Sequence, residues 1–167
     1  MISPKNKKIR FLIASGPTQE PLDPVRYLSN NSTGVMGKHL VETARAKGHK
    51  VTWLECPVKI RTALELEKTL KKLLPYHDVL IMAAAVCDVR PREVSKNKIK
   101  KDKLNSISLI KNPDILARLA KLKKKNQIFI GFGLESKDIL KNGREKLEKK
   151  SMEVIVLQKV TSNESPF

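Results

Sequence analysis

Five short runs of apolar residues, separated by helical patterns or loops, constrain the fold of this 167-residue chain more than any other feature. Most of them place aliphatic side chains on consecutive positions, which is typical of strands that are buried on both faces of a sheet. The runs occupy residues 9–15, 50–56, 78–85, 127–132 and 153–157. Because strands that alternate with helices form βαβ units, we predict an α/β fold with a doubly wound, mostly parallel sheet.

Helical patterns fill the gaps between these runs. Residues 34–47 place Met36, Leu40, Val41 and Ala44 on one face, as in an amphipathic helix that packs on a sheet. Further helices are predicted at residues 63–74 (with Thr62 and Glu65 as a capping box), from Asn112 or Pro113 to about Lys121, and at 136–150, and an edge strand is a candidate at 106–110. We therefore expect residues 1–167 to form one Rossmann-like domain with helices on both faces of the sheet.

Composition excludes several classes of protein. Two cysteines are too few for a disulfide scaffold, and neither they nor the three histidines have the spacing of a zinc site. No apolar run reaches transmembrane length and the N-terminus lacks the apolar core of a signal peptide, so we expect a cytoplasmic protein without a membrane partner. The net charge of +17 attracts nucleic acid, anionic membranes or phosphorylated small molecules without choosing among them, and a lysine-rich genome explains it equally well.

A long loop, GPTQEPLDPVRYLSNNSTGVMG at residues 16–37, follows the first predicted strand. Connections of this kind usually have a few residues, and longer ones are often functional. Since ligands of doubly wound sheets bind beyond the carboxyl ends of the strands, the loop is expected at the binding site. Small residues around Ser32, Thr33 and Gly34 would let backbone amides approach an anion, although Ser32 or Thr33 could equally be a helix cap.

The wording of this loop resembles the opening of the phosphopantothenate–cysteine ligase family, the synthetase half of the bifunctional coenzyme A enzyme. Four later stretches resemble the same family in the same order: AAAVCDVR at 83–90, NKIKK at 97–101, KNPDIL at 111–116 and IGFGLES at 130–136. The resemblance implies a ligase that joins 4′-phosphopantothenate and L-cysteine through an acyl-nucleotidylate. It also implies CTP, in preference to ATP, as co-substrate, and Mg²⁺ with the triphosphate.

The resemblance also implies roles for individual residues. Asn30 would hold the acyl-nucleotidylate, Lys98 would bind the triphosphate from a lysine-dense loop, and Arg26 would lie near phosphopantothenate, where a guanidinium suits a phosphate or carboxylate. Gly16, which directly follows the first strand, joins the nucleotide-binding residues that the resemblance implies: Met82, Ala83, Ala84, Asp88, Pro113, Asp114, Ile115, Leu116, Phe132, Lys146 and Lys150. No residue is expected to be a metal ligand.

Three positions depart from the family pattern. Val35 replaces a lysine, and Gln158 and Lys159 replace an asparagine and an aspartate. The family also continues well beyond the equivalent of Phe167. These differences leave open an alternative, a non-catalytic or degenerate nucleotide-binding homologue of the ligase.

Partners follow from the same resemblance. The family implies a homodimer in which a loop of one subunit reaches the other's site, and a flavin-dependent decarboxylase would be a separate chain. A nucleic-acid-binding role is disfavoured because aromatic residues make up 4% of the chain and none lies between residues 96 and 125. A dinucleotide-dependent oxidoreductase is disfavoured because the glycine-rich fingerprint is absent.

Overall fold

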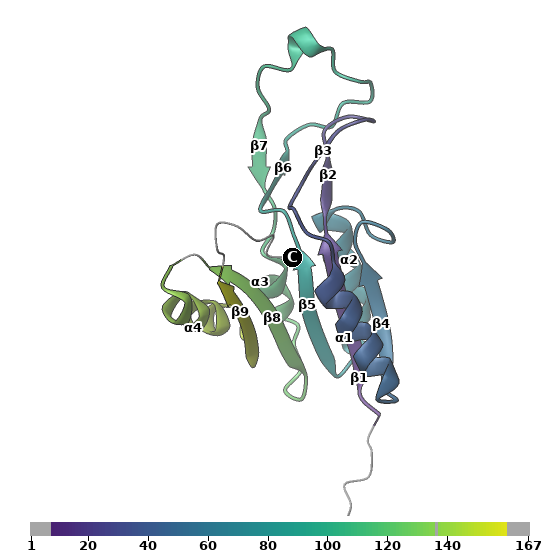
Figure 1. Cartoon of the computed structure of the whole chain (residues 1–167), viewed down its shortest axis with the longest axis vertical. Coiled ribbons are helices and arrows are strands. Elements are labelled where there is room, and N and C mark those ends of the chain that lie inside the picture. The colour runs from purple at the N-terminus through teal and green to yellow at the C-terminus, as the bar shows by residue number, and fades with distance from the viewer. Residues whose placement is uncertain (1–7, 136, 160–167) are drawn as a thin grey trace, which may run out of the picture.

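A computed structural model describes residues 8–135 and 137–159 and confirms the α/β fold, which is built on a five-stranded sheet (Figure 1). The strand order is β4-β1-β5-β8-β9, and each neighbouring pair is parallel. The strands are β1 (Arg10–Pro17), β4 (Lys50–Glu55), β5 (Val79–Ala85), β8 (Ile128–Glu135) and β9 (Val154–Lys159). Each strand begins within one residue of its predicted start, because each strand contains the apolar run from which it was predicted.

Helices cover both faces of this sheet, as predicted. They are α1 (Val35–Ala46), α2 (Ala63–Leu73), α3 (Ile115–Ala120) and α4 (Ile139–Lys149), with single 3₁₀ turns η1 (Leu74–Tyr76) and η2 (Lys101–Lys103). On one face, Val41 of α1 packs with Ile13 and Ile81 of the sheet. On the other face, α2 and α3 contribute to a larger core cluster, against which Leu147 of α4 packs.

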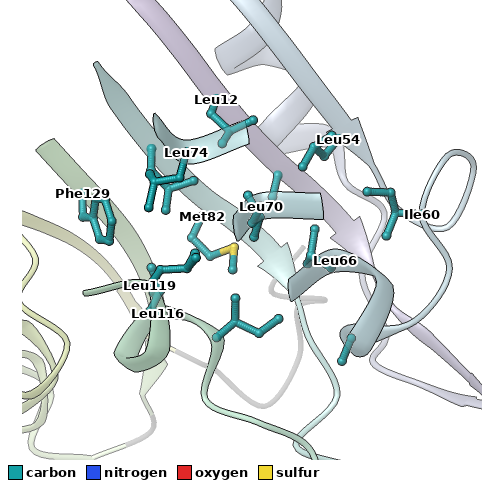
Figure 2. Packing of buried hydrophobic residues seen from close by; sticks show 14 of the residues in the cluster. Leu12, Leu54, Ile60, Leu66, Leu70, Leu74, Met82, Leu116, Leu119 and Phe129 are labelled. Atoms are coloured by element: carbon teal, nitrogen blue, oxygen red, sulfur yellow. The ribbon is translucent and has the colours of Figure 1, made fainter. Parts of the chain in front are cut away.

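The larger cluster holds most of the buried apolar side chains. Figure 2 shows leucines of α2 and α3 in one cluster with Leu12, Met82 and Phe129 of the sheet. Leu12, Leu66, Leu70, Leu119 and Phe129 have no exposed surface. Since burying one such side chain is worth about 1.5–3 kcal/mol, this layer supplies much of the stability that holds the strand ends in register.

The ends of the helices match the sequence only in part. The capping box of α2 forms as predicted, because the Thr62 hydroxyl accepts a hydrogen bond from the amide of Glu65 and the Glu65 carboxylate accepts one from Thr62. The predicted start of α3 is wrong: Asp114 is the N-cap and Ile115 the first helical residue. Met36 was assigned to the buried face of α1, but 53% of its surface is exposed.

Two small antiparallel hairpins extend beyond the carboxyl ends of the main sheet (Figure 1). They pair β2 (Gln19–Pro21) with β3 (Tyr27–Ser29) and β6 (Val89–Pro91) with β7 (Leu109–Lys111). We call these hairpins and the connecting loop at residues 92–108 the arm. The edge strand predicted at 106–110 is wrong in its bounds: the strand found there is β7, Leu109–Lys111, and it pairs with β6 and not with the main sheet.

Glu67 links α2 to α3 and provides a test of this packing. Its carboxylate, 7% exposed, lies 2.6 Å from the Lys71 ammonium and 3.1 Å from the Arg118 guanidinium. Burial opposes ionisation of Glu67, but the hydrogen bonds from Lys71 and Arg118 outweigh it and lower the pKa of this carboxyl. A lowered pKa means that the pair stabilises the fold above the pKa of the unfolded chain and that this stabilisation is lost as the pH falls through the folded value.

We therefore expect Glu67→Gln to lower the free energy of unfolding by about 1–2 kcal/mol at neutral pH. The difference in stability between this variant and the wild type should shrink towards about pH 3.5. At that pH the glutamate of the unfolded wild-type chain is largely protonated and therefore neutral, as the glutamine of the variant is at every pH. Urea denaturation at both pH values measures this. Glu42→Gln is the control, since the exposed Lys38–Glu42 pair spans 3.9 Å and should contribute at most about 0.5 kcal/mol. An equal loss for Glu67→Gln at both pH values would contradict the assignment.

Candidate functional site

Two cavities lie at the carboxyl ends of the central strands, on either side of the end of β5. One, of about 400 Å³, opens towards α3, and the other, of about 530 Å³, opens towards α1. The α3-side cavity is lined by Met82, Ala84, Val86, Cys87, Asp88, Val89, Lys111, Asn112, Pro113, Asp114, Ile115, Leu116, Phe132 and Lys150. The α1-side cavity is lined by Asn30, Val35, Met36, His39, Ala83, Ala84, Ala85, Val86, Asp88, Phe132, Gly133, Leu134, Lys146, Val156 and Gln158.

The cavities share a common wall. Ala84, Val86, Asp88 and Phe132 line both of them. Three of these four are predicted nucleotide-binding residues, and they come from the end of β5, from the second half of β8 and from the turn between β5 and β6. The parallel sheet brings them together because its strands all end at the same edge.

Asn30 lies in the α1-side cavity, directly after β3. Its amide Nδ2 donates to the carbonyl oxygen of Val86 over 3.1 Å, which ties the first hairpin of the arm to the turn after β5. Thr18, which is fully buried, strengthens the same junction: its hydroxyl accepts from the amide of Cys87, and its carbonyl accepts from the hydroxyl of Ser29. The position of Asn30 is therefore set by contacts within the first hairpin region and by contacts with the turn after β5, 56 positions further along the chain.

Asn112 joins the two walls of the α3-side cavity. Its side-chain amide donates to the carbonyl of Cys87 over 2.8 Å, and its backbone amide donates to the carbonyl of Asp88 over 2.8 Å. Its side-chain oxygen accepts from the guanidinium of Arg90. The turn that carries Asp88 and the segment Pro113–Leu116 are thus held at a fixed separation.

Lys146 lies in the last turn of α4 and Lys150 is its C-cap residue, but the two lysines line different cavities. Lys150 lines the α3-side cavity and lies 3.4 Å from a carboxylate oxygen of Asp114. Lys146 lines the α1-side cavity and forms an ion pair with Glu135. The hydrogen bonds that the Glu135 carboxylate accepts from Lys146 and, to a lesser extent, from Asn142 lower the pKa of this carboxyl, so Glu135 is ionised at neutral pH.

Arg26 and Lys98 lie on the arm, and within the described residues neither lines the two cavities. The Arg26 guanidinium donates to the carboxylate of Asp23 and to the carbonyl of Ile99. The Arg26 hydrogen bond lowers the pKa of the Asp23 carboxyl far below its usual range. Gly16 also lies outside both linings; its φ of +79° and a Cβ position 2.0 Å from the carbonyl oxygen of Cys56 allow only glycine at the end of β1.

Several lining residues were missed by the sequence analysis. Cys87 and Asn112 stand inside motifs that were recognised, yet the motifs did not reveal that their polar groups bridge the cavity walls. Met36 and His39 are exposed positions of α1 that the helical pattern did not connect with a site. Two of the three departures from the family pattern, Val35 and Gln158, also line the α1-side cavity.

Comparison with known proteins supports the reading of these motifs. Residues 6–167 match the family described as the DNA/pantothenate metabolism flavoprotein C-terminal domain. The chain belongs to this family. Among solved structures, the crystal structure of the C-terminal domain of coenzyme A biosynthesis bifunctional protein CoaBC has a TM-score of 0.79 and 29% identity to this chain, over 93% of this chain and 80% of that one.

Curated members of the family are longer than this chain. The CoaBC protein of Borreliella burgdorferi is 42% identical over 166 residues, which are 91% of this chain and 42% of the relative. The CoaBC protein of Escherichia coli is 36% identical over 183 residues, which are 99% of this chain and 45% of the relative. The chain therefore spans less than half the length of these relatives.

Within residues 8–135 and 137–159, no group of three or more His, Cys, Asp or Glu side chains is arranged to hold a metal ion. No helix there is both long and apolar enough to cross a membrane.

Proposed function

We propose that this chain is a phosphopantothenate–cysteine ligase domain of coenzyme A biosynthesis. One observation carries the proposal: nucleotide-binding residues that were predicted from separate motifs line two cavities that meet at Ala84, Asp88 and Phe132. The family to which the chain belongs and its CoaBC relatives support the same activity. The precise substrates, co-substrate and mechanism are part of the proposal.

In the proposed first step, the carboxylate of 4′-phosphopantothenate attacks the α-phosphate of CTP. An acyl-cytidylate forms and pyrophosphate leaves. Both reactants are anions, so the protein must position them and neutralise their repulsion. Lys150 in the α3-side cavity and Lys146 in the α1-side cavity, each positioned by an ion pair, would place a cation beside the triphosphate, and Lys98 would add a further cation from the arm.

In the second step, the amine of L-cysteine attacks the activated carbonyl, an amide bond forms and CMP leaves. Negative charge develops on the carbonyl oxygen during this attack. Asn30 is suited to donate a hydrogen bond to that oxygen, because its amide already points towards the cavity wall, where it donates to Val86. Asp88, which is exposed where the cavities meet, would accept hydrogen bonds from the ribose or base.

Mg²⁺ would enter with the triphosphate and neutralise part of its charge. Phosphate oxygens would supply most of its ligands, as is usual for Mg²⁺ in nucleotide sites. We propose CTP in preference to ATP because the motif wording resembles the bacterial members of the family. The expected cytoplasmic location stays a prediction.

The proposed enzyme acts as a homodimer. Arg26 and Lys98 belong to an arm that extends away from the main sheet (Figure 1), so a second copy could receive them at its own cavities. The curated relatives are named bifunctional proteins, and this chain spans less than half of them. A flavin-dependent decarboxylase is therefore the partner activity that we propose beside the ligase.

Pyrophosphate release tests the proposal. The protein is incubated with 4′-phosphopantothenate, Mg²⁺ and either CTP or ATP, and release is followed with a coupled enzyme assay. We expect release with CTP that requires phosphopantothenate, and much slower release with ATP. Release that is independent of phosphopantothenate, or absent with every nucleotide, would contradict the ligase.

The alternative is a homologue that binds nucleotide without ligating. Val35 and Gln158 favour it, because both departures from the family pattern line the α1-side cavity beside Asn30. This alternative predicts nucleotide binding by calorimetry together with no pyrophosphate release. Val35→Lys, which restores the family residue, would then increase nucleotide affinity without creating turnover.

A further inference from the structure

A buried carboxylate lies at the base of the arm, away from both cavities. The side chain of Asp23 has no exposed surface. Its Oδ1 accepts from the backbone amides of Val25 and Arg26, each over 2.8 Å, and its Oδ2 accepts from Nε of Arg26 over 3.0 Å. Burying a carboxylate costs free energy because the charged group loses its hydration, so buried carboxylates are found with their oxygens paired and hydrogen-bonded, as those of Asp23 are.

The same carboxylate reaches a third segment, the lysine-dense loop of the arm. Oδ2 of Asp23 accepts from the backbone amide of Ile99 over 3.1 Å, across 76 positions of sequence. Arg26 completes the contact, because its NH2 group donates to the carbonyl of Ile99 over 2.7 Å. Both backbone polar groups of Ile99 are therefore held by one ion pair, and we call this arrangement of Asp23, Arg26 and the Ile99 backbone the clamp.

The clamp holds the loop directly beside Lys98. Lys98 and Lys100 flank Ile99, and both are exposed. A second backbone contact, from the amide of Ser95 to the carbonyl of Leu22, ties the same loop to the first hairpin over 3.0 Å. The neighbouring peptide is thus fixed, while the Lys98 side chain remains exposed to solvent or to a partner.

The geometry of Arg26 fits this role. Its guanidinium offers donors in a rigid fork, and the donations from Nε and NH2 go to Asp23 and Ile99. Lysine, a single point charge on a flexible chain, cannot make the same set of contacts. The side chain of Arg26 is 30% exposed, whereas that of Asp23 is fully buried, so Asp23 anchors the pair.

We propose that Asp23 is a positioning residue that acts through Arg26 and the Ile99 backbone to fix where the arm presents Lys98. The role of Lys98 in the reaction rests on the proposed function, but the clamp itself does not. Asp23 lines neither of the two cavities. Its effect on the reaction is transmitted entirely by the loop that it holds.

Hydrogen exchange tests the clamp without any need for activity. Asp23→Asn removes the negative charge of the carboxylate and so weakens its hydrogen bonds to Arg26 and to the amide of Ile99. Hydrogen bonds to charged groups contribute enough stability that amides at 96–101 should exchange about tenfold faster in this variant. Asp102→Asn makes the same chemical change at an exposed position of the same loop and should leave that exchange unchanged. Arg26→Lys should accelerate exchange as Asp23→Asn does. Unchanged exchange at 96–101 in Asp23→Asn, or equal acceleration in β1 and β5, would overturn the clamp.

A double-mutant cycle tests whether the clamp works through Lys98. We expect Asp23→Asn to lower kcat for pyrophosphate release with little change in the KM for CTP. In a Lys98→Gln background, adding Asp23→Asn should change kcat by less than about twofold, since the residue that it positions is already gone. Independent, multiplying effects would overturn the link to Lys98. If the wild type releases no pyrophosphate, the proposed function fails, and hydrogen exchange still decides whether the clamp exists.

Discussion

Lys98→Gln is expected to slow CTP-dependent pyrophosphate release by about two to three orders of magnitude. The reason is electrostatic. The carboxylate and the triphosphate repel each other, and a preorganised cation that stabilises the transferring phosphate contributes more to the transition state than to the ground state. The loss should therefore appear mainly in kcat. Glutamine keeps the length and polarity of the side chain but removes its charge.

The loop offers a matched control for this prediction. Lys96, like Lys98, is exposed and lies in the same loop, two positions away. Lys96→Gln lowers the net charge of the protein by the same amount, so it should change kcat by no more than about twofold. Similar losses in both variants would show that only the overall positive charge of the arm matters, and the specific role of Lys98 would be rejected.

Phe129→Ala is expected to cause the largest loss of stability, about 3–5 kcal/mol. Phe129 is fully buried in the larger core cluster, which it shares with leucines of α2 and α3 (Figure 2). The ammonium group of Lys123 also lies 5.0 Å from its ring centroid. Removing the ring takes away both the transfer free energy and the packing of its neighbours, and leaves a cavity that the sheet cannot close.

Thermal and urea denaturation would measure this loss. For a domain of this size, the expected fall in Tm is about 10 °C. Ile128→Ala is the control, because Ile128 is the preceding residue of β8 and 42% of it is exposed. It should cost about 1 kcal/mol or less. A Phe129→Ala variant as stable as Ile128→Ala would contradict the assignment of the core.

The main sheet could be predicted because each of its strands carries its own local signal. Runs such as 78–85 are apolar at nearly every position, which only a strand covered on both faces tolerates in water. The capping box of Thr62 and Glu65 was equally local, since both partners lie within one helical turn. The period of apolar residues and the spacing of capping residues are enough to predict an element when the residues that specify it lie within that element.

The arm could not be predicted for the opposite reason. Its strands β2, β3, β6 and β7 have three residues each, which is too short for a period to be recognised. Its loop is held by contacts such as that of Asp23 with Ile99, across 76 positions. The sequence pattern also placed Met36 in the core. The apolar face of α1 is regular along the helix, but in the first turn more than half of the surface of Met36 stays exposed, and the helical period alone does not reveal this.

The site was predicted as a list of residues, but its division into two cavities was not. Lys146 and Lys150 are four residues apart, a spacing that predicts a shared helix face, yet they line different cavities. Likewise, Asn112 was expected only to open a helix, whereas its amide bridges the walls of the α3-side cavity. Such roles depend on which strand ends become neighbours, and spacing along one chain does not specify that.

The most direct test of the ligase is detection of its intermediate. The protein is mixed with CTP, Mg²⁺ and 4′-phosphopantothenate without cysteine, quenched in acid and analysed by mass spectrometry. We predict a species with the mass of the phosphopantothenoyl-cytidylate, which disappears when cysteine is added and is replaced by phosphopantothenoylcysteine and CMP. If CTP and ATP both bind but neither yields an acyl-nucleotidylate nor the amide product, the chain is not the ligase proposed here.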